Sequence, residues 1–183
     1  MYYRMNIAGL DRDLPICKVT DSLYIAGFVI FGDVELTVKT AEALVKKLPE
    51  HDVLITAESK GIPLIHEMAR QSGKPYVVAR KGVKVYMGNP VSVTVRSITT
   101  QKEQHLYLGE DEVNLIKGKK VLIVDDVIST GGSLESLENL VMQSGGEIVG
   151  KMTILAEGDA QDRADLIYLE KLPLFNPDGT VME

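Results

Sequence analysis

The stretch KKVLIVDDVISTGGSLESLENL, residues Lys119 to Leu140, joins an apolar run to two acidic residues, a glycine-containing turn and a helical pattern. Its first part is short, apolar and β-branched, which predicts a buried strand ending at Asp125 and Asp126. Its last part has leucines at helical spacing, which predicts a helix beginning at Gly132. Ligands of open parallel sheets bind beyond the carboxyl ends of the strands, so this turn is the first candidate for a binding site.

Strand-like and helix-like segments alternate through much of the chain. Short apolar runs predict strands over residues 52–57, 74–81, 119–126 and 147–157. Apolar side chains at helical spacing predict helices over residues 36–48, 61–73 and 132–145. Strands that are apolar on both faces and alternate with helices are typical of a parallel sheet covered on both sides. The sequence therefore predicts an α/β fold.

The segment from Gly82 to Lys117 interrupts this alternation. It is mostly polar, but its pieces PVSVTVRSI (90–98) and QHLYL (104–108) are rich in β-forming residues. They predict a β-hairpin or a long flap. A segment of this length that leaves a compact core is usually functional.

Composition argues against several kinds of protein. With 183 residues, 45% of them hydrophobic and 25% charged, the chain has the make-up of one soluble domain. A formal net charge of −6 argues against binding to nucleic acid or membrane surfaces through bulk positive charge. Cys17 is the only cysteine, which rules out an internal disulfide, and the histidines lack the spacing of metal ligands. No apolar run is long enough to cross a membrane, so we expect a cytoplasmic protein.

The turn after the strand has the composition of an anion-binding loop. Glycine lets the backbone approach a ligand closely, and successive N–H groups before a helix N-terminus attract negative charge. The turn therefore predicts a phosphate-binding loop formed by Ser129, Thr130, Gly131, Gly132 and Ser133. The alternative is a helix cap that binds no ligand. A Walker loop is ruled out, because no lysine follows the glycines.

The two acidic residues predict a second role for the same site. Carboxylates repel a neighbouring phosphate, but Asp125 and Asp126 are good acceptors for a pair of sugar hydroxyls, or ligands for Mg²⁺. A phosphate loop one ligand length away from a diol acceptor describes a site for ribose-5-phosphate. The alternative is a pair of solvated acids at the end of a strand.

Several segments resemble the type I phosphoribosyltransferase family, in the order in which that family has them. VLIVDDVISTGGS (121–133) resembles the family's signature for phosphoribosyl pyrophosphate (PRPP). AESKG (57–61) resembles the loop that contacts pyrophosphate, and VARKGVK (78–84) resembles the Arg-Lys segment of the purine enzymes. FGDVELT (31–37) and DRADLIYLEKL (162–172) resemble segments of the adenine enzymes.

The resemblance implies a fold and a reaction. The expected fold is a parallel twisted sheet flanked by helices, with a flexible β flap and a small hood made by the two termini. We expect a single domain over residues 1–183, with its core at about 36–156 and its hood at 1–35 and 157–183. The expected reaction transfers ribose-5-phosphate from PRPP to a purine base and releases pyrophosphate, with Mg²⁺ as cofactor. A homodimer is implied, because the Arg-Lys segment of related enzymes reaches a neighbouring subunit's site.

Adenine, giving AMP, is the first choice of base, but the sequence departs from the adenine enzymes. Lys60 and Gly61 stand where those enzymes have Arg-Gly, and Gly32 stands where they have Arg. SITTQKEQ (97–104) and ESKGIPL (58–64) resemble segments of xanthine phosphoribosyltransferases. The alternatives are therefore a xanthine or hypoxanthine/guanine enzyme, or a PRPP-sensing regulator without catalysis.

The resemblance also implies roles for individual side chains. Asp125 and Asp126 would hold the ribose hydroxyls, and they are candidate ligands for the Mg²⁺ that PRPP carries. Glu103 in the flap is the candidate general acid or base, with a solvated charge as its alternative. Phe31 and Val127 match positions that sandwich the base, although Phe31 also fits the core. Pyrophosphate would lie against Glu58, Ser59, Lys60, Gly61, Arg80, Lys81 and Lys84, of which the basic residues have a solvated charge run as their alternative.

Overall fold

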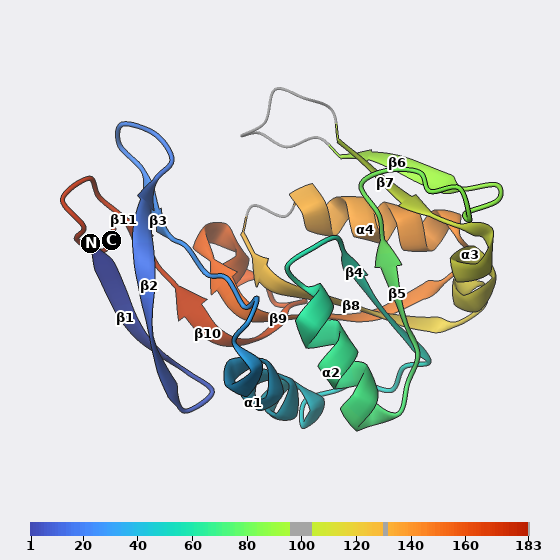
Figure 1. Cartoon of the computed structure of the whole chain (residues 1–183), viewed down its shortest axis with the longest axis horizontal. Helices are drawn as coiled ribbons and strands as arrows, with labels where there is room; N and C mark the ends of the chain where they lie inside the picture. The colour runs from blue at the N-terminus through green and yellow to red at the C-terminus, as the bar shows by residue number, and fades with distance from the viewer. Residues whose placement is uncertain (96–103, 130–131, 183) are drawn as a thin grey trace.

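The computed structural model describes residues 1–95, 104–129 and 132–182, and a five-stranded parallel sheet lies at its centre. The strand order is β10-β9-β8-β4-β5 (Figure 1). These strands are β4 (Val53–Ala57), β5 (Tyr76–Ala79), β8 (Lys120–Ile128), β9 (Glu147–Glu157) and β10 (Ile167–Leu172). Every residue of β4 is buried, as expected for a strand that neighbours cover on both faces. The predicted parallel sheet is confirmed.

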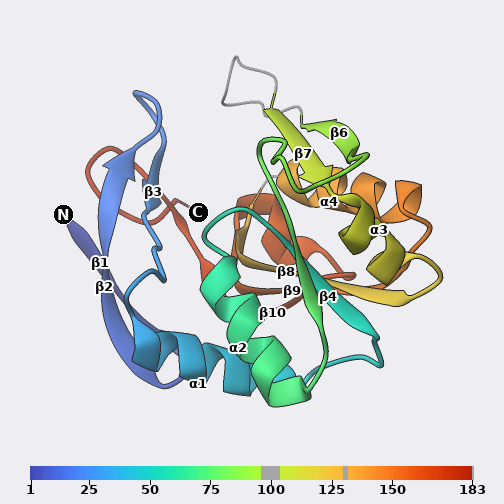
Figure 2. The same cartoon turned by 45° about the vertical axis from the view of Figure 1, so that its right-hand side comes forward.

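Helices cover both faces of this sheet (Figure 2). They are α1 (Val34–Val45), α2 (Ile62–Ser72), α3 (Glu110–Ile116), α4 (Gly132–Gln143) and the short 3-10 helix η1 (Gly158–Asp162). α1 and α2 bury Leu44 and Met68 against one face, and α3 and α4 bury Ile116 and Leu137 against the other. In the part of the chain that the structure describes, no helix is both long and apolar enough to cross a membrane.

The predicted hairpin is present as β6 (Val91–Val95) and β7 (Gln104–Leu108), which pair antiparallel with Val93 opposite Leu106. Both of these side chains are buried in the cluster that includes α4. The same segment also contains α3, which we did not predict. Three acidic residues form the first turn of α3 and only Ile116 in it is buried, so its apolar stripe is too short to recognise.

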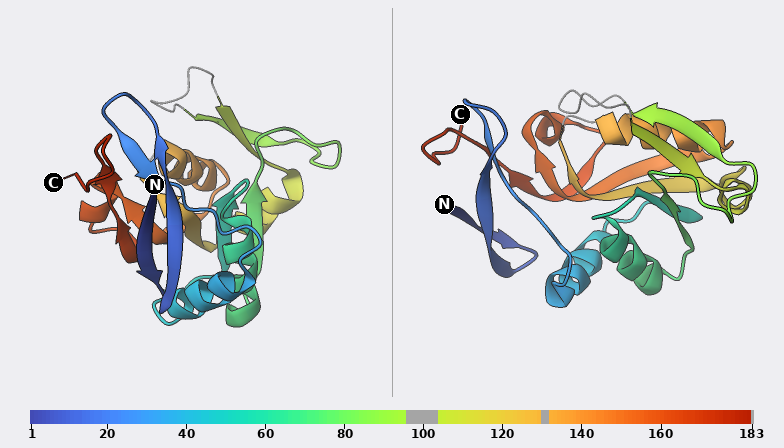
Figure 3. Two further views of the ribbon diagram at one scale, coloured as in Figure 1. Left: turned by 60° about the vertical axis from the view of Figure 1, so that its left-hand side comes forward. Right: turned by 45° about the horizontal axis from the view of Figure 1, so that its top comes forward.

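The hood is a separate antiparallel sheet at one end of the core, and both chain termini lie on it (Figures 1 and 3). Its strands, in spatial order, are β1 (Tyr2–Ile7), β2 (Leu10–Lys18), β3 (Tyr24–Ala26) and β11 (Leu174–Phe175). The sequence pattern of residues 1–35 does not predict these strands. β10 also differs from our expectation, because it pairs in parallel with β9 and so extends the core beyond residue 156.

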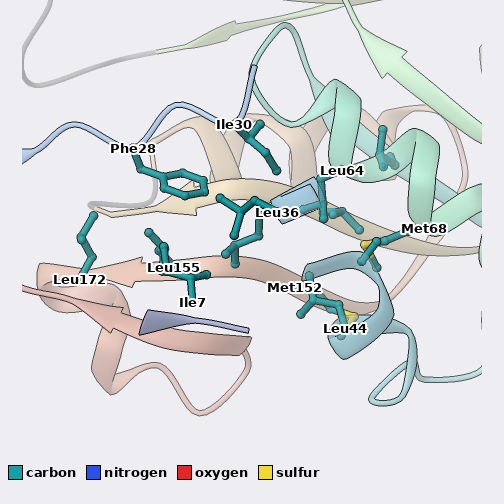
Figure 4. Close-up of a cluster of buried hydrophobic side chains, with 14 of the residues drawn as sticks. Ile7, Phe28, Ile30, Leu36, Leu44, Leu64, Met68, Met152, Leu155 and Leu172 are labelled. Carbon is teal, nitrogen blue, oxygen red and sulfur yellow. The ribbon is translucent and has the colours of Figure 1, made fainter. Parts of the chain in front are cut away.

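A cluster of buried side chains fastens the hood to the core (Figure 4). Phe28 and Ile30 belong to the hood linker, residues 27–33, which joins β3 to α1. They pack in the same cluster as Leu36 of α1 and Leu155 of β9. Burial of an apolar side chain of this size contributes about 1.5–3 kcal/mol. The hood linker is therefore held firmly on the face of the sheet that α1 and α2 cover.

A polar contact also holds the hood against α1. Asp33 caps α1 by accepting a hydrogen bond from the Leu36 backbone N–H at 3.0 Å, so α1 begins two residues earlier than predicted. The Nε of Arg12 on β2 donates to the other carboxylate oxygen of Asp33 at 2.6 Å. This guanidinium lowers the pKa of Asp33 below its ordinary value of 3.8.

Asp33→Ala is expected to lower the free energy of unfolding by about 0.5–2 kcal/mol at neutral pH, because it removes the helix cap and frees Arg12. Since the pKa of Asp33 is lower in the folded state, its contribution is complete above about pH 4 and is lost as the pH falls through the folded value. Urea unfolding at several pH values checks this. The difference in unfolding free energy between wild type and variant should narrow in acid. Asp21→Ala, which removes only a solvent-exposed ion pair with Lys18, should show a much smaller difference at neutral pH.

Candidate active site

A cleft with a volume of about 250 Å³ opens where β4 and β8 end. The carboxyl ends of neighbouring parallel strands share one edge of the sheet, so the segments that follow β4 and β8 meet there. This is the edge at which the sequence predicts a site. The cleft is lined by Ala57, Glu58, Ser59, Lys60, Lys81, Leu106, Asp125, Asp126, Val127 and Ser133.

Of the predicted phosphate loop, Ser133 lines this cleft, whereas Ser129 and Gly132 do not. α4 begins at Gly132, and Ser133 in its first turn lines the cleft. The hydroxyl of Ser136 donates to the Gly132 carbonyl oxygen at 2.9 Å, which ties this first turn together. The first N–H groups of a helix have no partner within it and favour an anion. Thr130 and Gly131 lie outside the described residues.

The two adjacent acids have different surroundings. Asp126 is 3% exposed, and its Oδ2 has no hydrogen-bond partner among the described residues. Oδ1 of Asp125 instead accepts a hydrogen bond from the Asp126 backbone N–H at 2.9 Å. Burial, together with the charge of Asp126, raises the pKa of Asp125 well above its ordinary value. The pair therefore combines a protonation-prone carboxyl with a second one that faces a cation.

That cation is Lys60, on the loop that follows β4. Its Nζ lies 3.1 Å from Oδ2 of Asp126, which is ion-pair distance although the angles do not make a hydrogen bond. The same Nζ donates a hydrogen bond to the Phe28 carbonyl oxygen at 3.3 Å. Lys60 thus touches the end of β8 and the hood linker at once. The sequence offered no signal for its contact with Phe28, because the two residues are far apart in the chain.

The Arg-Lys segment is anchored to the same loop. Arg80 Nε donates to Oε2 of Glu58 at 3.3 Å, and the Lys81 backbone N–H donates to the same oxygen at 3.0 Å. These two donors lower the pKa of Glu58. The guanidinium of Arg80 also donates to the Tyr86 hydroxyl at 3.0 Å. Arg80 is therefore engaged within the protein, while Lys81 lines the cleft.

Gly61 lies directly against the acid pair. A Cβ at this position would be 2.3 Å from Oγ1 of Thr56 and 2.9 Å from Oδ1 of Asp125, closer than real Cβ contacts. Only glycine lets the loop pass so close to the end of β8. Thr56, which is fully buried, is part of this arrangement, and our sequence analysis did not single it out.

The predicted site residues are only partly brought together. Of those predicted to contact pyrophosphate, Glu58, Ser59, Lys60 and Lys81 line the cleft, whereas Gly61, Arg80 and Lys84 do not. For the base, Val127 lines the cleft, but Phe31 does not and is 50% exposed. Glu103 lies outside the described residues. Leu106 of the hairpin lines the cleft and was not predicted, because nothing distinguishes it from an ordinary strand leucine.

Sequence relatives are purine enzymes. A hypoxanthine/guanine phosphoribosyltransferase of Methanothermus fervidus is 31% identical over 157 residues, which cover 82% of this chain and 79% of that protein. A hypoxanthine/guanine phosphoribosyltransferase of Methanococcus maripaludis is 34% identical over 113 residues, covering 62% of this chain. The match spans only 57% of the length of that relative.

Solved structures with a similar fold are adenine enzymes. The adenine phosphoribosyltransferase of Thermoanaerobacter pseudethanolicus is 25% identical with a TM-score of 0.67, covering 78% of this chain and 84% of that one. The enzyme of Saccharomyces cerevisiae is 24% identical with a TM-score of 0.70, covering 85% and 93%. Residues 33–170 match the phosphoribosyl transferase domain. The geometry of the cleft, the fold and this match agree, and the chain belongs to the phosphoribosyltransferase family.

Proposed function

We propose that this protein is a purine phosphoribosyltransferase that transfers ribose-5-phosphate from PRPP to a purine nitrogen and releases pyrophosphate. The observation that carries the proposal is the meeting of three elements at one cleft. These are the N-terminus of α4 with Ser133, the acids Asp125 and Asp126, and the loop that carries Lys60. Each element suits a different part of PRPP.

The 5-phosphate of PRPP would lie at the start of α4, where unpaired N–H groups and the Ser133 hydroxyl are available. The ribose hydroxyls would donate to Asp125 and Asp126, which are acceptors at the floor of the cleft. Pyrophosphate would lie between Lys60 and Lys81, which are the cationic side chains among the described residues that line the cleft. Cations at this position would stabilise the charge that develops as pyrophosphate leaves.

The residues present fit a magnesium ion that arrives with PRPP. Among the described residues, no group of three or more acidic, histidine or cysteine side chains could hold a metal by itself. Mg²⁺ is commonly bound by one or two carboxylates and by substrate phosphates, and Asp125 and Asp126 could supply the carboxylates. When bound, the ion would neutralise charge on the pyrophosphate.

The comparisons support two different kinds of purine as the base that accepts the ribose-5-phosphate. The solved structures with a similar fold are adenine enzymes, which favours our first choice, adenine. The sequence relatives are named hypoxanthine/guanine enzymes, which favours a 6-oxopurine. The homodimer also remains a proposal, supported by the exposed apolar side chains of Val83, Val85 and Tyr86 beside the Arg-Lys segment.

Pyrophosphate release from PRPP and Mg²⁺ should be measured with adenine, hypoxanthine, guanine and xanthine separately. At least one base is expected to support turnover, and the ratio of kcat/KM values identifies the preferred one. Omission of the base provides the blank, because a transferase should not hydrolyse PRPP at a comparable rate. Binding of PRPP without release of pyrophosphate for any base would instead identify a PRPP-sensing regulator.

A further inference from the structure

Lys60 joins three segments that are far apart in the chain. It belongs to the loop after β4, its Nζ lies 3.1 Å from Asp126 Oδ2 at the end of β8, and it donates to the Phe28 carbonyl oxygen at 3.3 Å. Phe28 lies on the hood linker, which also carries Phe31, the residue predicted to face the base. One side chain thus touches Asp126, which is proposed to hold the ribose, and the hood linker, whose Phe31 is the predicted base contact although it does not line the cleft.

The positive charge of Lys60 also acts on several neighbouring carboxyl groups. Burial raises the pKa of Asp125 and of Glu157 at the end of β9, and in both cases the charge of Lys60 opposes that shift. Oδ2 of Asp126 is buried and has no hydrogen-bond donor among the described residues. The position of the Lys60 ammonium therefore affects Asp125 and Asp126 in the cleft and Glu157 outside its lining, and the Lys60 side chain is 45% exposed.

We infer that Lys60 is a positioning residue that couples the pyrophosphate subsite to the base subsite, an inference that rests on the proposed function. Without ligand, Lys60 holds the hood linker through the Phe28 carbonyl oxygen. Two opposite unit charges about 4 Å apart attract each other by about 1–4 kcal/mol in water or near a protein surface, whereas the Phe28 carbonyl oxygen carries no net charge. Pyrophosphate in the cleft therefore draws the ammonium away from the Phe28 carbonyl oxygen. This frees the backbone of the hood linker at that point, while the Phe28 and Ile30 side chains stay packed in the core, and lets the base bind.

The inference predicts the sign of two effects on base binding. Wild-type protein should bind its purine substrate weakly alone and at least about fivefold more tightly with Mg²⁺ and inorganic pyrophosphate, a typical size for coupling between sites. Lys60→Met, which cannot hold the carbonyl oxygen of Phe28, should bind the purine alone at least about fivefold more tightly than wild type does. A residue with only a structural role would weaken binding when replaced.

Isothermal titration calorimetry with the purine that supports turnover tests this, with and without Mg²⁺ and pyrophosphate. Lys60→Arg keeps the charge and should behave like wild type, and the exposed Lys74→Met should have no effect on base affinity. Lys60→Gln replaces Lys60→Met if the latter fails to fold in a thermal melt. The inference is overturned if Lys60→Met, or its replacement Lys60→Gln, binds the purine no more tightly than wild type does. It is also overturned if pyrophosphate leaves the affinity of wild-type protein for the purine unchanged.

The outcomes separate this inference from the function on which it rests. If no purine releases pyrophosphate from PRPP with wild-type protein, the proposed function fails and the inference falls with it. If a purine turns over but Lys60→Met does not tighten its binding, the function stands and the coupling role of Lys60 is wrong.

Discussion

Asp126→Asn is expected to lower kcat/KM for PRPP by about 10- to 150-fold, which corresponds to the 1.5–3 kcal/mol that a hydrogen bond to a charged group contributes. The amide keeps the shape of the side chain but removes the charge that, in the proposed function, would accept a ribose hydroxyl. It also leaves Lys60, 3.1 Å away, without its counter-ion. Initial rates of pyrophosphate release at varied PRPP concentration measure the effect.

Asp125→Asn provides a sharp comparison. Burial and the charge of Asp126 raise the pKa of Asp125, so loss of its charge costs less than it would for a free aspartate, and the Asp126 backbone N–H already donates to its Oδ1 at 2.9 Å. The loss of kcat/KM should therefore be smaller than for Asp126→Asn. Asp21→Asn, on a fully exposed side chain of the hood, is the control and should have wild-type rates. A larger loss of kcat/KM at Asp125 than at Asp126 would contradict this order.

Gly61→Ala is expected to lower kcat/KM by about 10²-fold, a typical cost when catalytic groups move by about 1 Å. The added Cβ would approach Thr56 Oγ1 to 2.3 Å and Asp125 Oδ1 to 2.9 Å, so the loop or the acid must shift. Overpacking should also reduce the free energy of unfolding by about 1–3 kcal/mol. Steady-state rates and urea unfolding measure the two effects.

The contact between the added Cβ at Gly61 and Thr56 Oγ1 can be removed separately. Thr56→Ala deletes Oγ1, so the double variant Thr56→Ala with Gly61→Ala should recover part of both losses relative to Gly61→Ala. Gly82→Ala is the matched control, because a Cβ at Gly82 meets no atom within 4 Å. Losses in the double variant that equal the sum of the two single ones would refute the role given to this contact.

Prediction from sequence succeeded where a segment's burial can be read from its own residues. The part of β8 before Asp125 is apolar and buried because neighbours cover both of its faces, although β8 continues to Ile128, two residues beyond its predicted end. The helix after Gly61 ends at Gly73, whose φ of 69° favours glycine. Prediction failed where burial comes from a distant partner. β10 is largely half-exposed along its length, and only its pairing with β9 places it in the core.

The sequence by itself determined the parallel sheet, the family and the presence of adjacent acids beside a glycine turn, because these depend on residues that are neighbours in the chain. Only the tertiary structure decided which partners each charge has. In the folded chain Arg80 donates a hydrogen bond to Glu58, and Lys60 lies between Asp126 and the Phe28 carbonyl oxygen. The physical reason is that electrostatic and hydrogen-bond energies depend on distances between atoms, and folding sets those distances for residues that the chain keeps far apart.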